Sequence, residues 1–254
     1  VGTVGNTVGT EDLVITGAGS DFSTADVGSE NLAVTYTLAD GVNGKASNYQ
    51  LADQNISGSI TKRTLTMTGT TIQSREYDGT TTAGTVNIGT EGNVVVGENL
   101  TVTIGGVANF SSADVGTENL AVTYTLADGV GGKASNYQLA GQNITGSITK
   151  RTLTMSGTTI QSREYDGSTT AGTVNIGTEG NVVVGENLVV TIGGVANFSS
   201  ADVGSENLMV SYTLADGVNG KASNYQLADE NISGSITKRT LTMTGTTIQS
   251  REYD

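Results

Sequence analysis

Apolar and polar residues alternate with a period of two along much of the chain. In the run 119–126 (NLAVTYTL), every second residue from Leu120 is a large apolar or aromatic residue, and the residues between them are Ala or Thr. The runs 100–104 and 64–67 alternate in the same way. Because successive side chains of a strand point to opposite faces, this pattern predicts half-buried β-strands.

Short turn-forming sequences separate these runs. Asp78-Gly79, Asp128-Gly129 and the stretch 89–93 (GTEGN) are examples, and Asp, Asn and Gly are the residues that tight turns favour. No stretch carries the spacing of an amphipathic helix. We therefore expect an all-β fold, a tandem array of small β-sandwich (Ig-like) modules. The strand order within a module is left open, and a β-grasp arrangement with a short helix is an alternative.

The chain is built from repeats. The pentapeptide RTLTM begins at Arg63, again at Arg151 and again at Arg239, so the interval is 88 residues. Residues 63–150 and 151–238 differ at ten positions and align without a gap. The fixed register indicates a true array, with full repeats at 63–150 and 151–238.

The two outer segments match parts of a repeat. Residues 1–62 correspond to the later part, without its opening strands, and residues 239–254 correspond to the opening strand of a further repeat. The simplest explanation is a fragment cut from a longer array. The alternative is that the opening strand of one molecule completes the partial repeat of the next by strand donation.

The parity of the apolar positions changes where one repeat meets the next. Ile148 and Lys150 share one parity, whereas Leu153 and Met155 have the other, and a continuous strand cannot keep both sets on one face. This predicts module joints, without a Gly, Ser or Pro linker, at three positions: Lys62-Arg63, Lys150-Arg151 and Lys238-Arg239. Joints with so little slack favour an extended, stiff rod.

The alternation also predicts which side chains of a repeat face its core. The expected core residues are Leu65, Met67, Ile72, Val86, Val94, Val96, Val102, Ile104, Phe110, Val122, Tyr124, Tyr137, Leu139 and Ile148.

Composition excludes several kinds of chemistry. The 254 residues include no Cys and no His, which removes thiolate and imidazole catalysis and the usual zinc sites. The net charge of −13 argues against nucleic acid and against an anionic membrane surface, and no apolar run is long enough for a membrane helix. We expect no enzymatic activity and no cofactor.

One motif recurs at the start of each repeat. REYDGTTTA begins at Arg75 and REYDGSTTA at Arg163. Asp can bond to the backbone two residues on and Gly tolerates positive φ, so the motif predicts a chain-reversing corner with the tyrosine ring anchored near a sheet edge. The predicted turn residues are Tyr77, Asp78 and Gly79, and Tyr165, Asp166 and Gly167.

The sequence DGVNG resembles part of an oxygen-ligand calcium loop. It supplies the candidate ligands Asp40 and Asn43, and again Asp216 and Asn219. The copy between them has Gly131 in place of Asn, and no bidentate Glu follows at the required spacing. A polar turn is therefore the preferred interpretation. Acidic pairs such as Asp114 and Glu118, or Asp202 and Glu206, are weaker cation candidates of the same kind.

The order of the motifs identifies a family. RTLT, YDGTTTA, GVANFSSADVG (106–116), NYQL (136–139) and ITK (148–150) follow one another, and this set resembles the YDG/MBG repeats of large bacterial adhesins of the filamentous-haemagglutinin type. The resemblance implies a stalk at the cell surface or in a biofilm matrix, outside the cell. It implies no catalytic or ligand-binding residue.

Three functions are compatible with the sequence. The first is a non-enzymatic spacer in an exported adhesin, whose host or matrix ligand binds regions outside this segment. The second is a self-assembling extracellular filament formed by strand donation or end-to-end stacking. The third is a repeated glycan- or protein-binding module. The expected partners are neighbouring repeats of the same chain, with self-association as the alternative.

Overall fold

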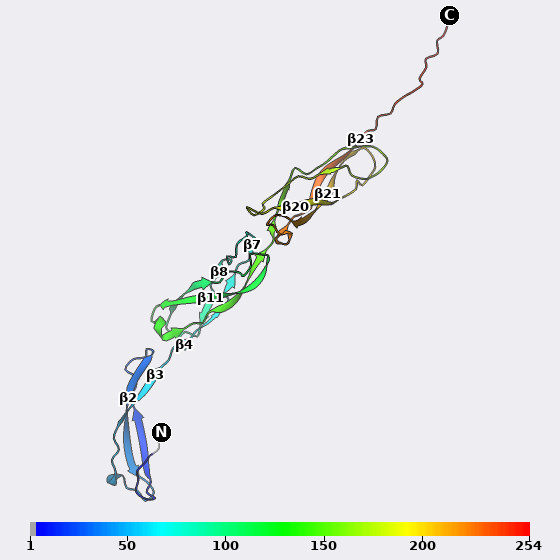
Figure 1. Ribbon diagram of the computed structural model, residues 1–254. Helices are drawn as coiled ribbons and strands as arrows, with labels where there is room; N and C mark the ends of the chain where they lie inside the picture. The colour runs from blue at the N-terminus through cyan, green and yellow to red at the C-terminus, as the bar shows by residue number, and fades with distance from the viewer. Residues whose placement is uncertain (1–3) are drawn as a thin grey trace. The chain divides into compact units, whose positions relative to one another are not determined.

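The computed structural model describes residues 4–254 and is all-β (Figure 1). It confirms the predicted fold class of repeated β modules. No α-helix occurs in these residues, and the helical turns are three short 3-10 segments: η1 (Ala46–Asn48), η2 (Ala134–Asn136) and η3 (Ala222–Asn224).

The contacts between residues divide the chain into two compact units. Unit 1 comprises the chain up to Thr71, Asn87–Val107 and Ala121–Asn143, and unit 2 comprises Ile72–Val86, Ala108–Leu120 and Ile144–Asp254. Unit 1 therefore contains the N-terminal partial repeat and part of repeat 63–150, and unit 2 contains the rest of that repeat, repeat 151–238 and residues 239–254.

The first part of unit 1 is an antiparallel sheet of three strands in chain order. The strands are β1 (Leu13–Gly19), β2 (Gly28–Asp40) and β3 (Gln54–Ile60). The long central strand pairs with both neighbours, with Leu13 opposite Asp40 and Gly28 opposite Ile60. Alternation continues along β2, where Leu32 and Val34 are half-buried and their neighbours exposed.

Residues 63–149 form ten strands. These are β4 (Arg63–Thr64), β5 (Thr66–Thr68), β6 (Thr71–Ile72), β7 (Arg75–Glu76), β8 (Val86–Asn87), β9 (Thr90–Gly92), β10 (Leu100–Val107), β11 (Gly116–Asp128), β12 (Tyr137–Gln138) and β13 (Gln142–Thr149). Within unit 1, β10 pairs with β11 and β5 with β9, both antiparallel, and β4 pairs parallel with β12. Leu65, Leu100 and Tyr137 form the core there. Within unit 2, β7 pairs parallel with the end of β13.

Residues 151–237 form the equivalent ten strands. These are β14 (Arg151–Thr152), β15 (Thr154–Ser156), β16 (Thr159–Ile160), β17 (Arg163–Glu164), β18 (Val174–Asn175), β19 (Thr178–Gly180), β20 (Leu188–Val195), β21 (Gly204–Asp216), β22 (Tyr225–Gln226) and β23 (Glu230–Thr237). A four-stranded sheet has the order β17-β23-β21-β20, and three two-stranded pairs accompany it: β14-β22, β15-β19 and β16-β18. Five buried residues form the core: Ile160, Phe198, Leu208, Val210 and Ile236.

The opening strands of a repeat pair with its closing strands. Arg163 of β17 lies opposite Ile236 of β23, and Arg151 of β14 lies opposite Tyr225 of β22, in both cases parallel. Such a repeat closes its core only when its first and last segments meet. The strand β13 ends at Thr149 and β14 begins at Arg151, so Lys150 alone separates them.

Most of the predicted core positions are buried or half-buried, with one clear error. Leu120 and Val122 are 1% and 0% exposed, as the alternation predicts. Val96, which the alternation places in the core, is instead fully exposed. The reason is a tight turn in which the amide of Glu98 donates to the carbonyl of Val95 at 3.0 Å and Gly97 has φ +90°. Val96 occupies the outer corner of this turn, which points to solvent.

Candidate functional site at the contact between consecutive repeats

The REYDG motif forms the same compact turn in both full repeats. Arg75 pairs with Asp78 at 2.6 Å, and the same carboxylate oxygen accepts a hydrogen bond from the amide of Thr80 at 2.9 Å. Gly79 follows with φ +79°, a left-handed conformation that side chains disfavour. The arginine side chain also donates to the carbonyl of Thr82 at 2.6 Å. The motif is therefore a turn held by its own arginine.

The second copy repeats these contacts. Arg163 pairs with Asp166 at 2.5 Å, and the amide of Ser168 donates to that carboxylate at 2.8 Å. Gly167 has φ +83°. In both copies the guanidinium lies over a phenylalanine ring at 5.8 Å, Phe110 in one and Phe198 in the other. This is the geometry of a cation–π contact.

Tyr77 packs against the following repeat. Its ring is 5% exposed and makes an edge-to-face contact with Tyr225, with the ring centres 5.4 Å apart. Its hydroxyl donates to Oε1 of Glu186 at 2.5 Å. The sequence predicts a ring anchored near a sheet edge, and the structure shows where that anchor lies: in residues 151–238, within unit 2.

Glu186 accepts a hydrogen bond from each of the two tyrosines. The hydroxyl of Tyr225 donates to Oε2 of Glu186 at 2.7 Å and accepts the amide of Val183 at 3.1 Å. Burial, followed by the hydrogen bond to Glu186, raises the pKa of both Tyr77 and Tyr225 above the ordinary value. Both phenols therefore stay protonated and serve as donors to one carboxylate.

Tyr165 provides an internal comparison for Tyr77. The two occupy equivalent backbone positions, because the amide of Tyr77 donates to Thr149 and that of Tyr165 to Thr237, each at 2.9 Å. Yet Tyr165 is 39% exposed, whereas Tyr77 is 5% exposed. The repeat itself sets the backbone position of this tyrosine, and contact with a following repeat buries the ring.

A polar cluster forms the second part of the contact. Asn224, at the end of η3, is 1% exposed. Its side-chain oxygen accepts the amide of Val115 at 2.9 Å, and its nitrogen donates to Asp114 at 2.9 Å. The other oxygen of Asp114 pairs with Lys221 at 2.6 Å. The hydrogen bond from Asn224, and then Lys221, lower the pKa of Asp114.

Unit 1 contains the same cluster one repeat earlier. Asn136 accepts the amide of Val27 and donates to Asp26, both at 2.9 Å, and Lys133 pairs with Asp26 at 2.5 Å. Two consecutive contacts thus use the same three side chains in the same geometry. We call this set of contacts, together with the tyrosine contact, the repeat joint.

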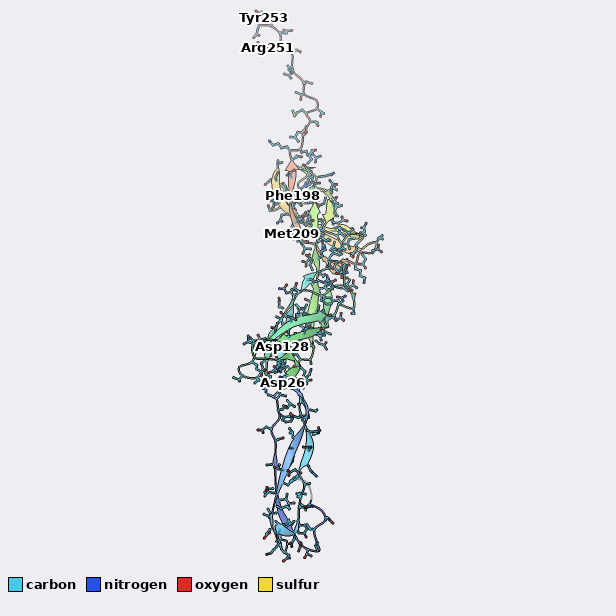
Figure 2. All side chains as sticks on the ribbon, turned by 90° about the vertical axis from the view of Figure 1, so that its left-hand side faces the viewer. Asp26, Asp128, Phe198, Met209, Arg251 and Tyr253 are labelled. Carbon is cyan, nitrogen blue, oxygen red and sulfur yellow. The ribbon has the colours of Figure 1, made fainter. Side chains whose placement is uncertain are left out.

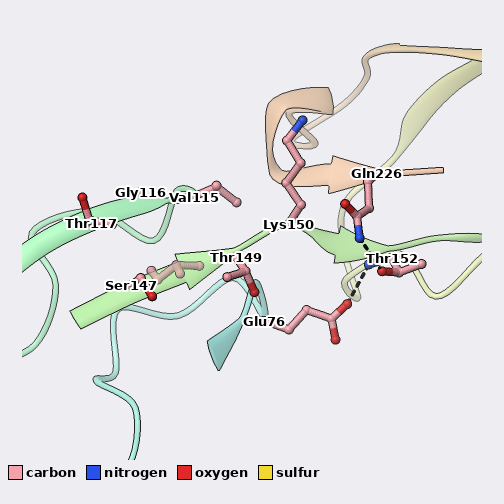
Figure 3. Close-up of a pocket in the computed structure, with 10 residues that line it drawn as sticks. Glu76, Val115, Gly116, Thr117, Ser147, Thr149, Lys150, Thr152 and Gln226 are labelled. Carbon is pink, nitrogen blue, oxygen red and sulfur yellow. Dashed lines mark hydrogen bonds between the residues drawn. The ribbon is translucent and has the colours of Figure 1, made fainter. Parts of the chain in front are cut away.

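A surface groove lies beside the joint in unit 2 (Figure 3). Glu76 accepts the amide of Thr152 at 2.6 Å, and the side chain of Gln226 donates to the hydroxyl of Thr152 at 2.8 Å. The side chain of Lys150 points away from both contacts. Of these two contacts, the one between Glu76 and Thr152 crosses the junction, and the one between Gln226 and Thr152 lies within residues 151–238.

The residues predicted at the joints have different roles. Lys62, Lys150 and Lys238 are exposed and make none of the ion pairs found in residues 4–254. Arg63 and Arg151 bind the turn at Asn93 and Asn181 through pairs of hydrogen bonds of 2.6–2.8 Å. Arg239 lies 3.8 Å from Glu164.

The DGVNG loops hold their shape through backbone contacts. Asp40 and Asp216 each accept a backbone amide six residues ahead at 2.7 Å. Asn43 and Asn219 have φ of +57° and +60°, and Gly131 in the middle copy has +74°. Asn and Gly are the residues that tolerate this conformation. Backbone geometry thus accounts for the Asn-to-Gly exchange, and no cluster of three metal-binding side chains occurs in the described part of the chain.

The other acidic candidates are also engaged. Glu118 accepts both the amide and the hydroxyl of Ser111, at 2.8 and 3.0 Å, and Glu206 accepts the same two groups of Ser199. Asp114 belongs to the joint, and Asp202 accepts from Ser200. These carboxylates stabilise turns and the joint.

Sequence reasoning missed the residues on the receiving side of the joint. These are Glu186, Lys221 and Asn224. Their polar side chains lie outside the alternating runs, and the copies are too similar for their differences to mark a contact. Tyr225 is the counterpart of the predicted core residue Tyr137, and only its contact with Tyr77 was missed.

Comparison with known proteins identifies the repeats. The model of the YDG domain matches residues 61–145 and again residues 149–232. No curated protein matches the chain. Between residues 4 and 254, no helix has the length and apolar character needed to cross a membrane.

Proposed function

The chain belongs to the YDG domain family, with two copies in tandem, and from this we propose that it is a non-enzymatic spacer of an exported bacterial adhesin. In this function the repeats separate a cell anchor from a distal binding region. The location is extracellular, at the bacterial surface or in a secreted matrix. The resemblance of the motifs to adhesin repeats motivates this assignment, and the chain's lack of Cys is compatible with it.

The observation that carries the proposal is the repeat joint. Tyr77 is buried against the next repeat, and Asn224 is buried against the previous one. Two buried side chains that cross in opposite directions resist both bending and twisting between neighbours. A spacer needs this property, because reach depends on the resistance of each joint to rotation.

The joint depends on specific side chains. Asn224 satisfies a backbone amide and a carboxylate at once, and Glu186 accepts two phenol protons. When a buried polar group loses its hydrogen-bond partner, the free energy of the folded state rises. Each repeat is therefore held in one orientation on its neighbour, so that added copies extend the array by equal steps.

Solution scattering on arrays of increasing copy number tests this function. We expect the maximum dimension to grow linearly with the number of repeats, whereas freely jointed repeats would grow roughly as the square root. The matched variant Tyr77→Ala/Asn224→Ala should bend at the altered joint. Linear growth that persists unchanged in this variant would mean that the joint does not set the stiffness.

Surface location needs its own measurement. Antibodies against the repeats should label intact cells of the source bacterium, and external protease should remove the signal. Labelling only after the cells are permeabilised would contradict the extracellular assignment.

A further inference from the structure

We propose that the opening and closing strands of a full repeat form a mechanical clamp, which lets the repeat bear tension along the chain. In residues 151–238 the opening strands are β14 and β17, and the closing strands are β22 and β23. All four lie within unit 2. This function goes beyond that of a spacer, since a spacer can hold its neighbours in line and still unfold under a small pulling force.

The opening and closing strands run side by side in the same direction. Arg151 of β14 lies opposite Tyr225 of β22, and farther along, Glu164 of β17 lies opposite Thr237 of β23. Both pairs are parallel. The chain therefore enters the repeat at one end of these paired strands and leaves the repeat at their other end.

This arrangement sets the direction in which tension acts on the strands. The eight residues of β23 extend roughly 26 Å, whereas neighbouring strands are about 4.8 Å apart. A line from the point of entry to the point of exit therefore runs nearly along the strands. Tension on the chain pulls the opening strands toward one end of the repeat and the closing strands toward the other, so that the two slide against each other.

The direction of the pull decides how the hydrogen bonds between the strands are strained. When two strands slide along each other, all the bonds between them stretch together and must break together. When two strands are peeled apart from one end, the bonds break one after another, each at a small force. Forced unfolding depends on the height of the unfolding barrier. Parallel strands at the entry and the exit therefore give a high barrier against tension along the chain.

Hydrogen bonds join the opening and closing strands at both ends of the clamp. At the entry end, the amide of Leu153 donates to the carbonyl of Gln226 at 2.8 Å. At the exit end, the amide of Tyr165 donates to the carbonyl of Thr237 at 2.9 Å. The hydroxyl of Thr237 also donates to the carbonyl of Arg163 at 3.2 Å. Because these bonds lie at opposite ends, sliding strains both sets at the same time.

Buried side chains hold both sides of the clamp in the core. Leu153 and Ile160, from the opening part of the repeat, are 3% and 8% exposed. Tyr225 and Ile236, from the closing part, are 1% and 2% exposed. Ile160 and Ile236 belong to the same core cluster. Sliding draws these side chains out of their packed positions, so the loss of apolar burial adds to the loss of hydrogen bonds.

The REYDG turn anchors the opening strands at their far end. Arg163 of β17 donates to the carbonyl of Thr170 at 2.5 Å and pairs with Asp166 at 2.5 Å. Its guanidinium also lies over the ring of Phe198, a buried residue among the strands of this repeat (Figure 2). The strand under tension is therefore tied to its own turn and to the core at the point where it pairs with β23.

The preceding repeat has the same contacts. Its opening strands β4 and β7 pair in parallel with β12 and β13. The amides of Leu65 and Tyr77 donate to the closing side at 2.8 and 2.9 Å, as their counterparts do. In addition, Glu76 of β7 accepts the amide of Thr152, beyond the end of β13, at 2.6 Å (Figure 3). The clamp thus recurs in both full repeats.

Pulling on one repeat in two directions tests the proposal. The chain of 254 residues contains no Cys, so two introduced thiols fix the points at which force acts on the otherwise intact chain. Lys150→Cys with Lys238→Cys pulls the strands along their length. Lys150→Cys with Ser223→Cys places both points at the entry end and peels β14 from β22. All three residues are exposed.

The two directions should give different unfolding forces in single-molecule force spectroscopy. We expect the force along the strands to be at least about twice the peeling force at the same pulling speed, because the clamp raises the barrier in one direction only. The 88 and 73 residues between the two pairs of thiols should release about 30 and 25 nm of chain, at roughly 3.4 Å per residue. Equal forces in the two directions would overturn the proposal.

Two variants separate the clamp from general stability. Arg163→Leu removes the anchor of β17 and should bring the ratio of the two forces closer to one. Val210→Ala removes packing from the central strand β21, outside the clamp, and should lower the melting temperature with little change in that ratio. An equal fall of the ratio in both variants would show that overall stability sets the force. The measurement uses neither the source cell nor a ligand, so its result is independent of the test of surface location.

Discussion

The hydroxyl of Tyr77 lies 2.5 Å from Oε1 of Glu186, a residue 109 positions later in the chain. The contact joins the tyrosine of the YDG turn to the next repeat and depends on the ring's being buried there. The turn itself is held within the repeat by the pairing of Arg75 with Asp78, whereas Gly79 also lies close to the next repeat, because a Cβ at this position would come within 3.2 Å of Val183 Cγ1. The tyrosine therefore has a role distinct from that of Arg75 and Asp78, namely to connect neighbours.

Replacement of this tyrosine should affect the two copies differently. We expect Tyr77→Ala to lower the free energy of unfolding of unit 2 by about 3 kcal/mol, because a buried aromatic ring leaves a cavity. Tyr165→Ala should cost less than about 1 kcal/mol, because that ring is 39% exposed. Urea denaturation of both variants measures the difference. Equal losses would show that the ring stabilises its own repeat.

Asn224 should contribute more than Lys221 to the free energy of unfolding. Asn224→Ala leaves the amide of Val115 and an oxygen of Asp114 without their buried partner, which costs about 1–3 kcal/mol. Lys221→Ala removes an exposed ion pair, worth about 0–1 kcal/mol. Thermal unfolding of both variants at low and high salt measures the order. A larger effect for Lys221→Ala would contradict the assignment of the joint to buried hydrogen bonds.

The joint should weaken in acid. The pKa of Asp114 in the folded chain lies below the ordinary value of 3.8, first because of Asn224 and then because of Lys221. A depressed pKa contributes stability that is present above the unfolded value and is lost as the pH falls through the folded value. Asp114→Asn should therefore be less stable than the parent near neutral pH, with a smaller difference below pH 3.8. Asp202→Asn serves as the control, since Asp202 has no lysine partner in the described residues.

The strands were predictable from sequence, and the joint was not. Alternation identified Leu120 and Val122 because a sheet with one buried face imposes a period of two. The prediction that Val96 lies in the core was wrong because a turn overrides the local pattern. The contact of Tyr77 with Glu186 has no local signal at all, since two side chains outside the strands meet across a repeat boundary.

The parallel pairing of opening and closing strands also could not be predicted from the sequence. Arg163 and Ile236 become neighbours only when the whole repeat has folded, and no turn sequence links them. Similarly, the Asp and Asn of the DGVNG loops suggested calcium ligands as the alternative to a polar turn, whereas the positive φ at Asn219 and Gly131 explains why Asn or Gly stands at that position. Where a residue type suits two roles, only its backbone conformation decides between them.

The DGVNG loop should respond to backbone changes and be indifferent to calcium. Gly131→Asn should be nearly neutral, because Asn43 and Asn219 adopt the same conformation, whereas Gly131→Val should cost about 1–2 kcal/mol. Calorimetry measures both variants. Neither calcium nor a chelator should change the melting temperature of the parent chain, and a calcium-dependent rise would restore the metal interpretation.

Alkaline pH should disrupt the tyrosine contacts of the joint. Burial, followed by the hydrogen bond to Glu186, places the pKa of Tyr225 above its ordinary value of 10.0, and Tyr77 shifts in the same direction. A raised pKa contributes stability that is present below the unfolded value and is lost as the pH rises through the folded value. The free energy of unfolding of unit 2 should therefore fall once the pH exceeds 10.0. In a tyrosinate absorbance titration, the parent should retain a late-ionising fraction that shrinks in Tyr77→Phe. A parent whose tyrosines all ionise together near 10.0 would contradict the buried Tyr77–Glu186–Tyr225 arrangement.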